Sequence, residues 1–189
     1  GVQALGVAAD LSMSDAPQHV FATALAHFRH IDILINTAAY CVNADIFALT
    51  ADEIDRHYAV NVRAMLLLCQ AFVRQHDGRS GGRIINFTSG QTLTPMPTEL
   101  PYIATKSAIE GLTGSLARAV VSHHITVNTI DPGATDTGWI DAALREQLIQ
   151  HAPLGRIGEP IDVAHLVRFL VSDQGQWMTG QVLHSRGGA

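Results

Sequence analysis

Short apolar runs alternate with longer amphipathic segments along this chain of 189 residues. The short runs predict buried strands over residues 2–9, 31–35, 83–88, 125–130 and 181–184. The longer segments repeat apolar residues at helical spacing, and they predict helices from Ser14 onward, from Thr50 to about His76, from Tyr102 to about Val121, within 136–150, and from Ile161 to Val171. Strands that alternate with helices are typical of an α/β fold with a parallel sheet.

Local signals sharpen the boundaries of two helices. Residues 14–17 (Ser-Asp-Ala-Pro) offer an N-cap followed by proline in the first turn, and residues 50–53 (Thr-Ala-Asp-Glu) have the pattern of a capping box. Asn61 lies inside the second helix, where helix propensity alone would not place it. Gly111 and Gly114 each cost a helix roughly 1 kcal/mol against alanine, so we expect them to pack closely against another helix.

Composition limits the classes of protein to consider. Hydrophobic residues make up 47% of the chain and charged residues 15%, which suits one domain over residues 1–189 with a sizeable core. The formal net charge of −5 and the lack of a Lys/Arg cluster argue against nucleic acid or an anionic membrane as a partner. No apolar run approaches the ~20 residues of a membrane span, and no signal-peptide pattern opens the sequence, so we expect a cytoplasmic protein.

Cysteine and histidine give little sign of further chemistry. Cys41 and Cys69 are unpatterned, and we expect a loop thiol and a buried helix residue rather than a disulfide. None of the ten histidines has the spacing of metal ligands, and His19, His27 and His30 resemble a solvated helix face. We therefore expect no metal site.

The most informative polar pair is Tyr102 and Lys106. Their spacing of four places phenol and ammonium on one face of a helix, and Ser89 follows a predicted strand earlier in the chain. A free tyrosine ionises near pH ~10, and a nearby ammonium favours the phenolate, so we expect Lys106 to lower the pKa of Tyr102. The Ser89 hydroxyl could then polarise a carbonyl group. A helix can also carry such a pair by chance, so further residues have to decide.

Those residues are present as motifs in order along nearly the whole chain. They include Ala8-Ala9-Asp10-Leu11, Asp32 to Ala39, Asn61-Val62, Gly82 to Ser89, Tyr102 to Lys106, Ile125 to Asn128, Asp131 to Thr137, Leu154 to Pro160, Thr179 to Gln181 and Gly187-Gly188. With these motifs in register, the sequence resembles the classical short-chain dehydrogenase/reductase family, and especially its members similar to 3-oxoacyl-acyl-carrier-protein reductase. The resemblance implies a three-layer, doubly wound, Rossmann-like parallel sheet.

The resemblance also implies a catalytic tetrad of Asn61, Ser89, Tyr102 and Lys106. Ser89 would hydrogen-bond the substrate oxygen, and Tyr102 would give that oxygen a proton during reduction or remove it during oxidation. Lys106 would lower the pKa of Tyr102 and hold the nicotinamide ribose. Asn61 would expose a backbone carbonyl at a helical irregularity and seat a water that relays protons.

The implied cofactor is NAD or NADP, with NADP slightly favoured by the resemblance. Asp10 and Leu11 would flank the adenine, and Thr37, Ala38 and Ala39 would follow a strand end beside the ribose, where the family usually has Asn-Asn-Ala-Gly and this chain has Asn36-Thr37-Ala38-Ala39. Tyr102 and Lys106 would also contact the cofactor. The nicotinamide carboxamide would be clasped by Pro132, Gly133, Thr135 and Thr137, although a sequence such as Asp131-Pro132-Gly133 alone is simply a turn.

The Gly-rich turn that binds pyrophosphate in this family does not occur before Val2. The sheet, as given, would lack its first strand-helix-strand unit, so we expect the sequence to be part of a longer protein. The choice between NAD and NADP depends on that missing unit.

The expected activity is interconversion of a ketone and a secondary alcohol, with a 3-oxoacyl substrate as one possibility. Segments Gln91 to Pro101 and Trp139 to His151 would line the substrate pocket, and the second is rich in apolar residues: Trp139, Ile140, Leu144, Leu148 and Ile149. They suit an acyl chain or hydrophobic ketone, or alternatively ordinary helix packing. By resemblance, two long helices would form the interfaces of a homotetramer or homodimer. The alternative function is a non-catalytic dinucleotide-fold sensor or assembly subunit.

Overall fold

The computed structural model describes residues 1–79, 81–90, 93–138 and 140–188. The described residues form a four-stranded parallel sheet in the order β1-β2-β3-β4. Its strands are β1 (Ile33–Asn36), β2 (Gly82–Phe87), β3 (Ile125–Asp131) and β4 (Val182–His184). All four strands run parallel, so each connection has to carry the chain from the carboxyl end of one strand back to the amino end of the next. Helices on the faces of the sheet supply these crossovers. The predicted α/β class is confirmed.

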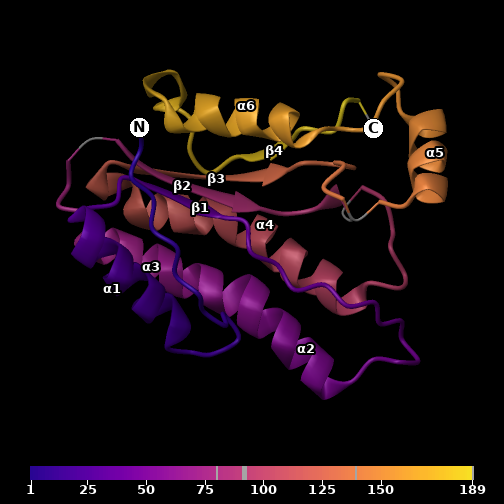
Figure 1. Cartoon of the computed structure of the whole chain (residues 1–189), viewed down its shortest axis with the longest axis horizontal. Coiled ribbons are helices and arrows are strands. Elements are labelled where there is room, and N and C mark those ends of the chain that lie inside the picture. The colour runs from indigo at the N-terminus through magenta and orange to yellow at the C-terminus, as the bar shows by residue number, and fades with distance from the viewer. Residues whose placement is uncertain (80, 91–92, 139, 189) are drawn as a thin grey trace.

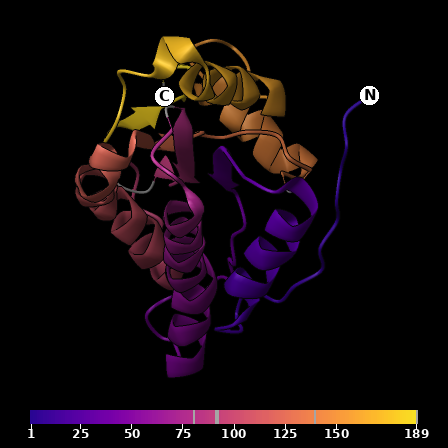
Figure 2. The same ribbon diagram turned by 90° about the vertical axis from the view of Figure 1, so that its left-hand side faces the viewer.

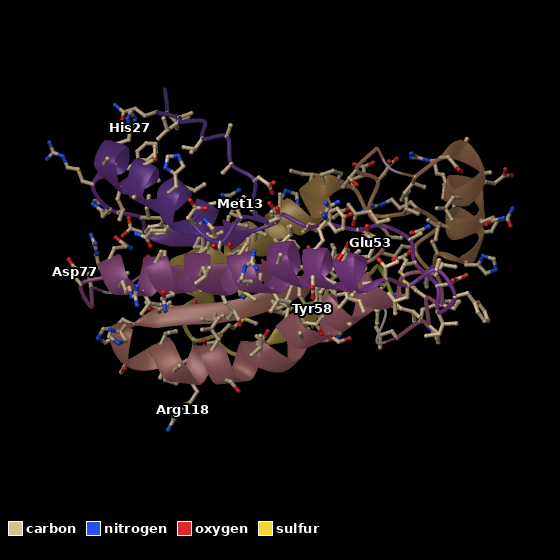
Figure 3. The ribbon with its side chains drawn as sticks, turned by 90° about the horizontal axis from the view of Figure 1, so that it is seen from below. Met13, His27, Glu53, Tyr58, Asp77 and Arg118 are labelled. Atoms are coloured by element: carbon tan, nitrogen blue, oxygen red, sulfur yellow. The ribbon has the colours of Figure 1, made fainter. Side chains whose placement is uncertain are left out.

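Helices cover both faces of the sheet and make three layers (Figures 1 and 2). One face is covered by α1 (Ala16–Phe28), α3 (Met65–Gln75) and α4 (Leu100–Val120), which lie side by side in Figure 3. The other face is covered by α6 (Pro160–Val171). The helix α5 (Ala142–His151) stands apart, beyond the carboxyl ends of the strands (Figure 1).

Neighbouring residues of β2 show why two helical layers are needed. Ile84 and Ile85 are both fully buried, and their side chains point to opposite faces because successive residues of a strand alternate. Ile84 joins the hydrophobic cluster beneath α1, α3 and α4, whereas Ile85 joins the cluster beneath α6 with Ile130 and Leu170. A strand buried on both faces is typical of a doubly wound sheet.

The long helix predicted from Thr50 to His76 is divided in the structure. It consists of α2 (Ala51–Tyr58), a π-helical segment η1 (Ala59–Ala64) and α3. The Thr50 side chain accepts a hydrogen bond from the Glu53 backbone N–H, as the N-terminal signal predicts. Asn61 lies within the π-helical segment, so the irregularity expected around this residue is present.

The strand predicted over residues 2–9 is wrong. These residues form no regular structure and run along the outside of α1 (Figure 2), and the Val2 side chain is 97% exposed. A strand exists only when a neighbour satisfies its backbone groups, and no described strand pairs with this segment. The prediction rested on the apolar residues of this segment alone, and it failed because the segment has no partner strand among the described residues.

Smaller predictions have mixed outcomes. Cys41 is exposed in a loop and Cys69 is buried in α3, as predicted. The histidines predicted to form a solvated helix face, His19, His27 and His30, are exposed. The expected close packing at Gly111 and Gly114 is not found within the described chain, because a Cβ added to either glycine would have no atom within 4 Å.

Candidate active site

The predicted catalytic side chains meet at the carboxyl end of β2. Tyr102 and Lys106 lie on α4, and Ser89 follows the end of β2. The Lys106 Nζ donates a hydrogen bond of 3.0 Å to the backbone oxygen of Phe87, and the Thr88 hydroxyl donates one of 3.1 Å to the Lys106 backbone oxygen. These two bonds fix the first turns of α4 against the loop that carries Ser89.

Asn61 is tied to the same region through its side chain. The side chain is 2% exposed, and its Oδ1 accepts a hydrogen bond of 2.7 Å from the Tyr40 backbone N–H. Its Nδ2 donates to the Tyr40 backbone oxygen and to the Thr105 Oγ1, both at 2.9 Å. Asn61 therefore joins the loop after β1 to the residue that precedes Lys106. Its role in seating a water remains a prediction.

The expected lowering of the Tyr102 pKa is not observed. Burial raises the pKa of Tyr102 to about 12, and Cys41 adds to the increase. A hydrogen bond with the Ser89 side chain opposes it. The Lys106 Nζ donates to the Phe87 backbone oxygen and lies over the face of the Tyr102 ring, 5.4 Å from the centroid, and its charge does not outweigh the burial of the phenol. Burial also lowers the pKa of Lys106 to about 8.

Cys41 is a site residue that the sequence reasoning missed. It lies close enough to Tyr102 and Lys106 to affect both pKa values, and its own pKa is raised by partial burial and by Glu99. The available signal was its place two residues after Ala39, in the loop that follows β1. A thiol in a loop has no special pattern, so only the fold reveals its neighbours.

The residues predicted near the adenine are partly brought together. Leu11, Thr37 and Ala38 line one mainly apolar pocket of about 290 Å³ with side chains of α1 and β1. Asp10 and Ala39 are exposed and do not line it. The pKa of Asp10 is lowered by hydrogen bonds with Ser12, so this carboxylate is an ionised acceptor in the segment before α1. The assignment of these residues to the adenine remains a prediction.

The residues predicted to clasp the nicotinamide follow the end of β3. Gly133 has a φ of +61°, a conformation that favours glycine, and its N–H donates 3.0 Å to the Asp131 carboxylate. The Thr135 hydroxyl donates 3.0 Å to the Pro132 oxygen, which stabilises the turn, while Thr137 is exposed. Because β2 and β3 are adjacent and parallel, this turn and the loop of Ser89 lie side by side at the carboxyl ends of the two strands.

The segments predicted to line the substrate pocket are described in part. Gln91 and Trp139 lie outside the described residues. Leu148 of α5 lines a second pocket, of about 400 Å³, together with Pro132, and α5 contains no buried residue. The apolar side chains of α5 are therefore not explained by ordinary core packing.

In the described part of the chain, the His, Cys, Asp and Glu side chains form no group of three or more that could hold a metal ion. None of its helices combines the length and the apolar character that crossing a membrane requires.

Comparison with known proteins identifies the family. A family model described as enoyl-(acyl carrier protein) reductase matches residues 1–189. An uncharacterised oxidoreductase of Bacillus subtilis, YjdA, is 42% identical over 190 residues, which cover 100% of this chain and 76% of that protein.

Solved structures agree with the sequence matches. A short-chain dehydrogenase from Burkholderia cenocepacia in complex with NADP has a TM-score of 0.88 and 32% identity, and the match covers 96% of this chain and 75% of that one. A 3-ketoacyl-(acyl-carrier-protein) reductase from Brucella melitensis, complexed with NADH, has a TM-score of 0.88 and 30% identity, covering 96% of this chain and 77% of that one. The chain therefore belongs to the short-chain dehydrogenase/reductase family and is an NAD(P)-dependent oxidoreductase.

Proposed function

We propose that the protein interconverts a ketone and a secondary alcohol, with Tyr102 as the group that gives or takes the proton. The observation that carries the proposal is the placement of Tyr102 beside Ser89 and Lys106 at the carboxyl end of β2. In open parallel sheets, ligands bind outside the carboxyl ends of the strands. With a pKa of about 12, Tyr102 is protonated at neutral pH, which is the state needed to protonate a carbonyl oxygen during reduction.

The neighbouring side chains have complementary roles in this proposal. The Ser89 hydroxyl donates to the carbonyl oxygen and stabilises the charge that develops there. Lys106, whose Nζ lies over the face of the Tyr102 ring, is the neighbouring group on the path by which Tyr102 regains its proton from solvent. Asn61 holds Tyr40 and Thr105 and thereby fixes the loop and helix on either side of the reacting group.

The cofactor of the proposal is NAD or NADP, which supplies the hydride or accepts it. Leu11, Thr37 and Ala38 would hold its adenine end in the apolar pocket, and Asp10 would accept from the exocyclic amine. The turn of Pro132, Gly133, Thr135 and Thr137 would hold the nicotinamide end, with Tyr102 and Lys106 at the ribose. Ala39 lies in the loop that follows β1, beside Thr37 and Ala38 in the sequence. Both cofactors occur in solved relatives, so both belong in the first assay.

The proposed substrate is a hydrophobic ketone, and a 3-oxoacyl thioester is the specific candidate. The pocket of about 400 Å³ beside Pro132 is lined by the apolar side chains of Leu148, Leu154 and Ile157 and also by polar ones: His151, Arg156, Asp162, Ser185 and Arg186. A 3-ketoacyl reductase among the solved relatives supports the same class. A panel containing a cyclic ketone, an aryl ketone and a 3-oxoacyl thioester separates the general from the specific substrate.

The proposal treats residues 1–189 as one domain that assembles as a homodimer or homotetramer. Both hydrophobic clusters pack on the same sheet, which supports a single domain. Gly111 and Gly114 expose an unfilled surface on α4, which supports contact with a second copy there. Sedimentation of the purified chain measures the assembly directly.

The proposed role of Tyr102 is tested with Tyr102→Phe and the matched control Tyr58→Phe. Tyr58 lies on α2 and is 40% exposed, so loss of its hydroxyl should leave turnover unchanged. Tyr102→Phe should lower kcat roughly 100-fold or more, the usual contribution of a general acid, with unchanged circular dichroism. The assay follows oxidation of NADH and NADPH separately by absorbance. Full activity in Tyr102→Phe would show that another group supplies the proton.

A further inference from the structure

Arg186, which follows β4, lies between two loops of the proposed site. Its side chain is 14% exposed, and its Nη1 donates to the Gly90 backbone oxygen at 3.2 Å and to the Asp131 Oδ2 at 3.3 Å. Asp131, at the end of β3, is fully buried. Its Oδ1 accepts from the Gly133 N–H at 3.0 Å, and its Oδ2 also contacts the His184 Nδ1 at 2.9 Å.

The two glycines beside Arg186 show how closely it fits. A Cβ added to Gly133 would lie 3.0 Å from both Cα and Cγ of Arg186. A Cβ added to Gly90 would lie 1.8 Å from the Arg186 Nη1. The stem of Arg186 therefore passes Gly133, and its guanidinium ends against Gly90. The absence of a side chain at Gly90 and Gly133 leaves room for this approach from both loops.

We propose that Arg186 is a positioning residue that couples the loop of Ser89 and Gly90 to the turn of Pro132 and Gly133. One guanidinium nitrogen bonds the first loop directly, and it reaches the second through Asp131. Both bonds come from the same nitrogen, Nη1, so a displacement of either loop changes the contact that Arg186 makes with the other. The effect on turnover rests on the proposed function, because that function assigns the carbonyl oxygen to Ser89 and the nicotinamide end of the cofactor to the turn.

A simpler role for Arg186 is neutralisation of the buried Asp131 charge, and the variants have to separate the two roles. Arg186→Met alone would leave the buried Asp131 with His184 as its remaining side-chain partner and without its arginine, and could unfold the chain. The informative variant is therefore Arg186→Met with Asp131→Asn, which removes both charges but retains an acceptor for the Gly133 N–H. Asp131→Asn alone is the reference, because it keeps the bond from Arg186 to Gly90.

A matched control removes a different Arg–Asp pair. Arg79 and Asp77 form an ion pair of 2.9 Å just before β2, at the amino end of that strand and away from the two loops. Arg79→Met with Asp77→Asn changes the same atoms and the same net charge. It should leave both loops and the turnover unaffected.

The first measurement is hydrogen exchange by mass spectrometry on the full chain, which requires no turnover. The reporting amides are Leu93 and Thr94, which donate to the Gly90 oxygen, and Gly133, which donates to Asp131. In Arg186→Met/Asp131→Asn they should exchange about tenfold faster than in Asp131→Asn, since a hydrogen bond to a charged group is lost. Peptides from α1 and α3 should be unchanged. Equal exchange in the two variants would overturn the coupling.

The second measurement is the separation of kcat from KM with the best ketone of the panel. The double variant should lose about 10- to 100-fold in kcat relative to Asp131→Asn, with little change in KM, because misplacing a reacting group costs this much. A double variant as active as Asp131→Asn would show that Arg186 only neutralises Asp131. If the unmodified chain turns over no ketone, the proposed function fails, while the exchange result still decides whether Arg186 couples the loops.

Discussion

The clamp formed by Asn61 gives the most direct quantitative prediction. Its side chain makes three hydrogen bonds while being 2% exposed, two with the Tyr40 backbone and one with Thr105. Each such bond contributes about 1 kcal/mol net, and the donor and acceptor left behind in Asn61→Ala lose their partners. Alanine regains several tenths of a kcal/mol of helix propensity. We therefore expect Asn61→Ala to lower the free energy of unfolding by about 2–3 kcal/mol.

The assay is urea denaturation followed by circular dichroism, supported by thermal melting. A loss of this size should lower Tm by roughly 4–12 °C in a chain of this length. Asn43→Ala is the matched control, because Asn43 is exposed in the same loop and should change stability by less than about 0.5 kcal/mol. A loss below about 1 kcal/mol in Asn61→Ala would refute the idea that the clamp stabilises the fold.

A double-mutant cycle isolates one bond of the clamp. Thr105→Val removes the hydroxyl that accepts from the Asn61 Nδ2 at 2.9 Å and that donates to the Tyr102 backbone oxygen at 2.7 Å. If the Asn61–Thr105 bond is formed as described, the combined variant should be less destabilised than the sum of the two single variants, by about 1 kcal/mol. Strict additivity would show that Asn61 stabilises the loop after β1 without engaging α4.

Three further outcomes are expected. His76 is 6% exposed, and burial lowers its pKa in the folded chain. The free energy of unfolding should therefore fall as the pH drops through ~6.5, the pKa of histidine in the unfolded chain, by at most about 1.4 kcal/mol per pH unit. In His76→Leu, urea denaturation at two pH values should show a smaller fall. Alkylation of the native chain should label Cys41 and spare Cys69, whose burial raises its pKa to about 12, and mass spectrometry should find both labelled in urea. Gly133→Ala should lower the free energy of unfolding by at least about 1 kcal/mol in urea denaturation, because its φ is +61° and the added methyl meets the backbone of Arg186.

The sequence predicted the strands of the sheet better than it predicted the segment before α1. The buried runs at β2 and β3 could be recognised because both faces of these strands are covered, so nearly every residue is apolar or hydrogen-bonded. Residues 2–9 are equally apolar, yet they form no strand. Whether an apolar run becomes a strand depends on a partner strand, which is a non-local property.

The site was predictable as a set of residues but not as a set of interactions. The spacing of Tyr102 and Lys106 is local and follows from the helix. The contact of Lys106 with Phe87 depends on how α4 docks against β2, and that contact directs the ammonium to a backbone oxygen. Arg186 and Asp131 are far apart in sequence, so their pairing appears only when β3 and β4 lie side by side.

Burial at the carboxyl end of β2 sets the chemical state of the proposed site. With a pKa of about 12, Tyr102 is protonated at neutral pH, so its phenol can supply a proton to a carbonyl oxygen. The charge of Asp131 is among the causes that raise this pKa, and Arg186 pairs with that charge. Arg186 therefore limits an electrostatic penalty on Tyr102 while it holds the neighbouring loops.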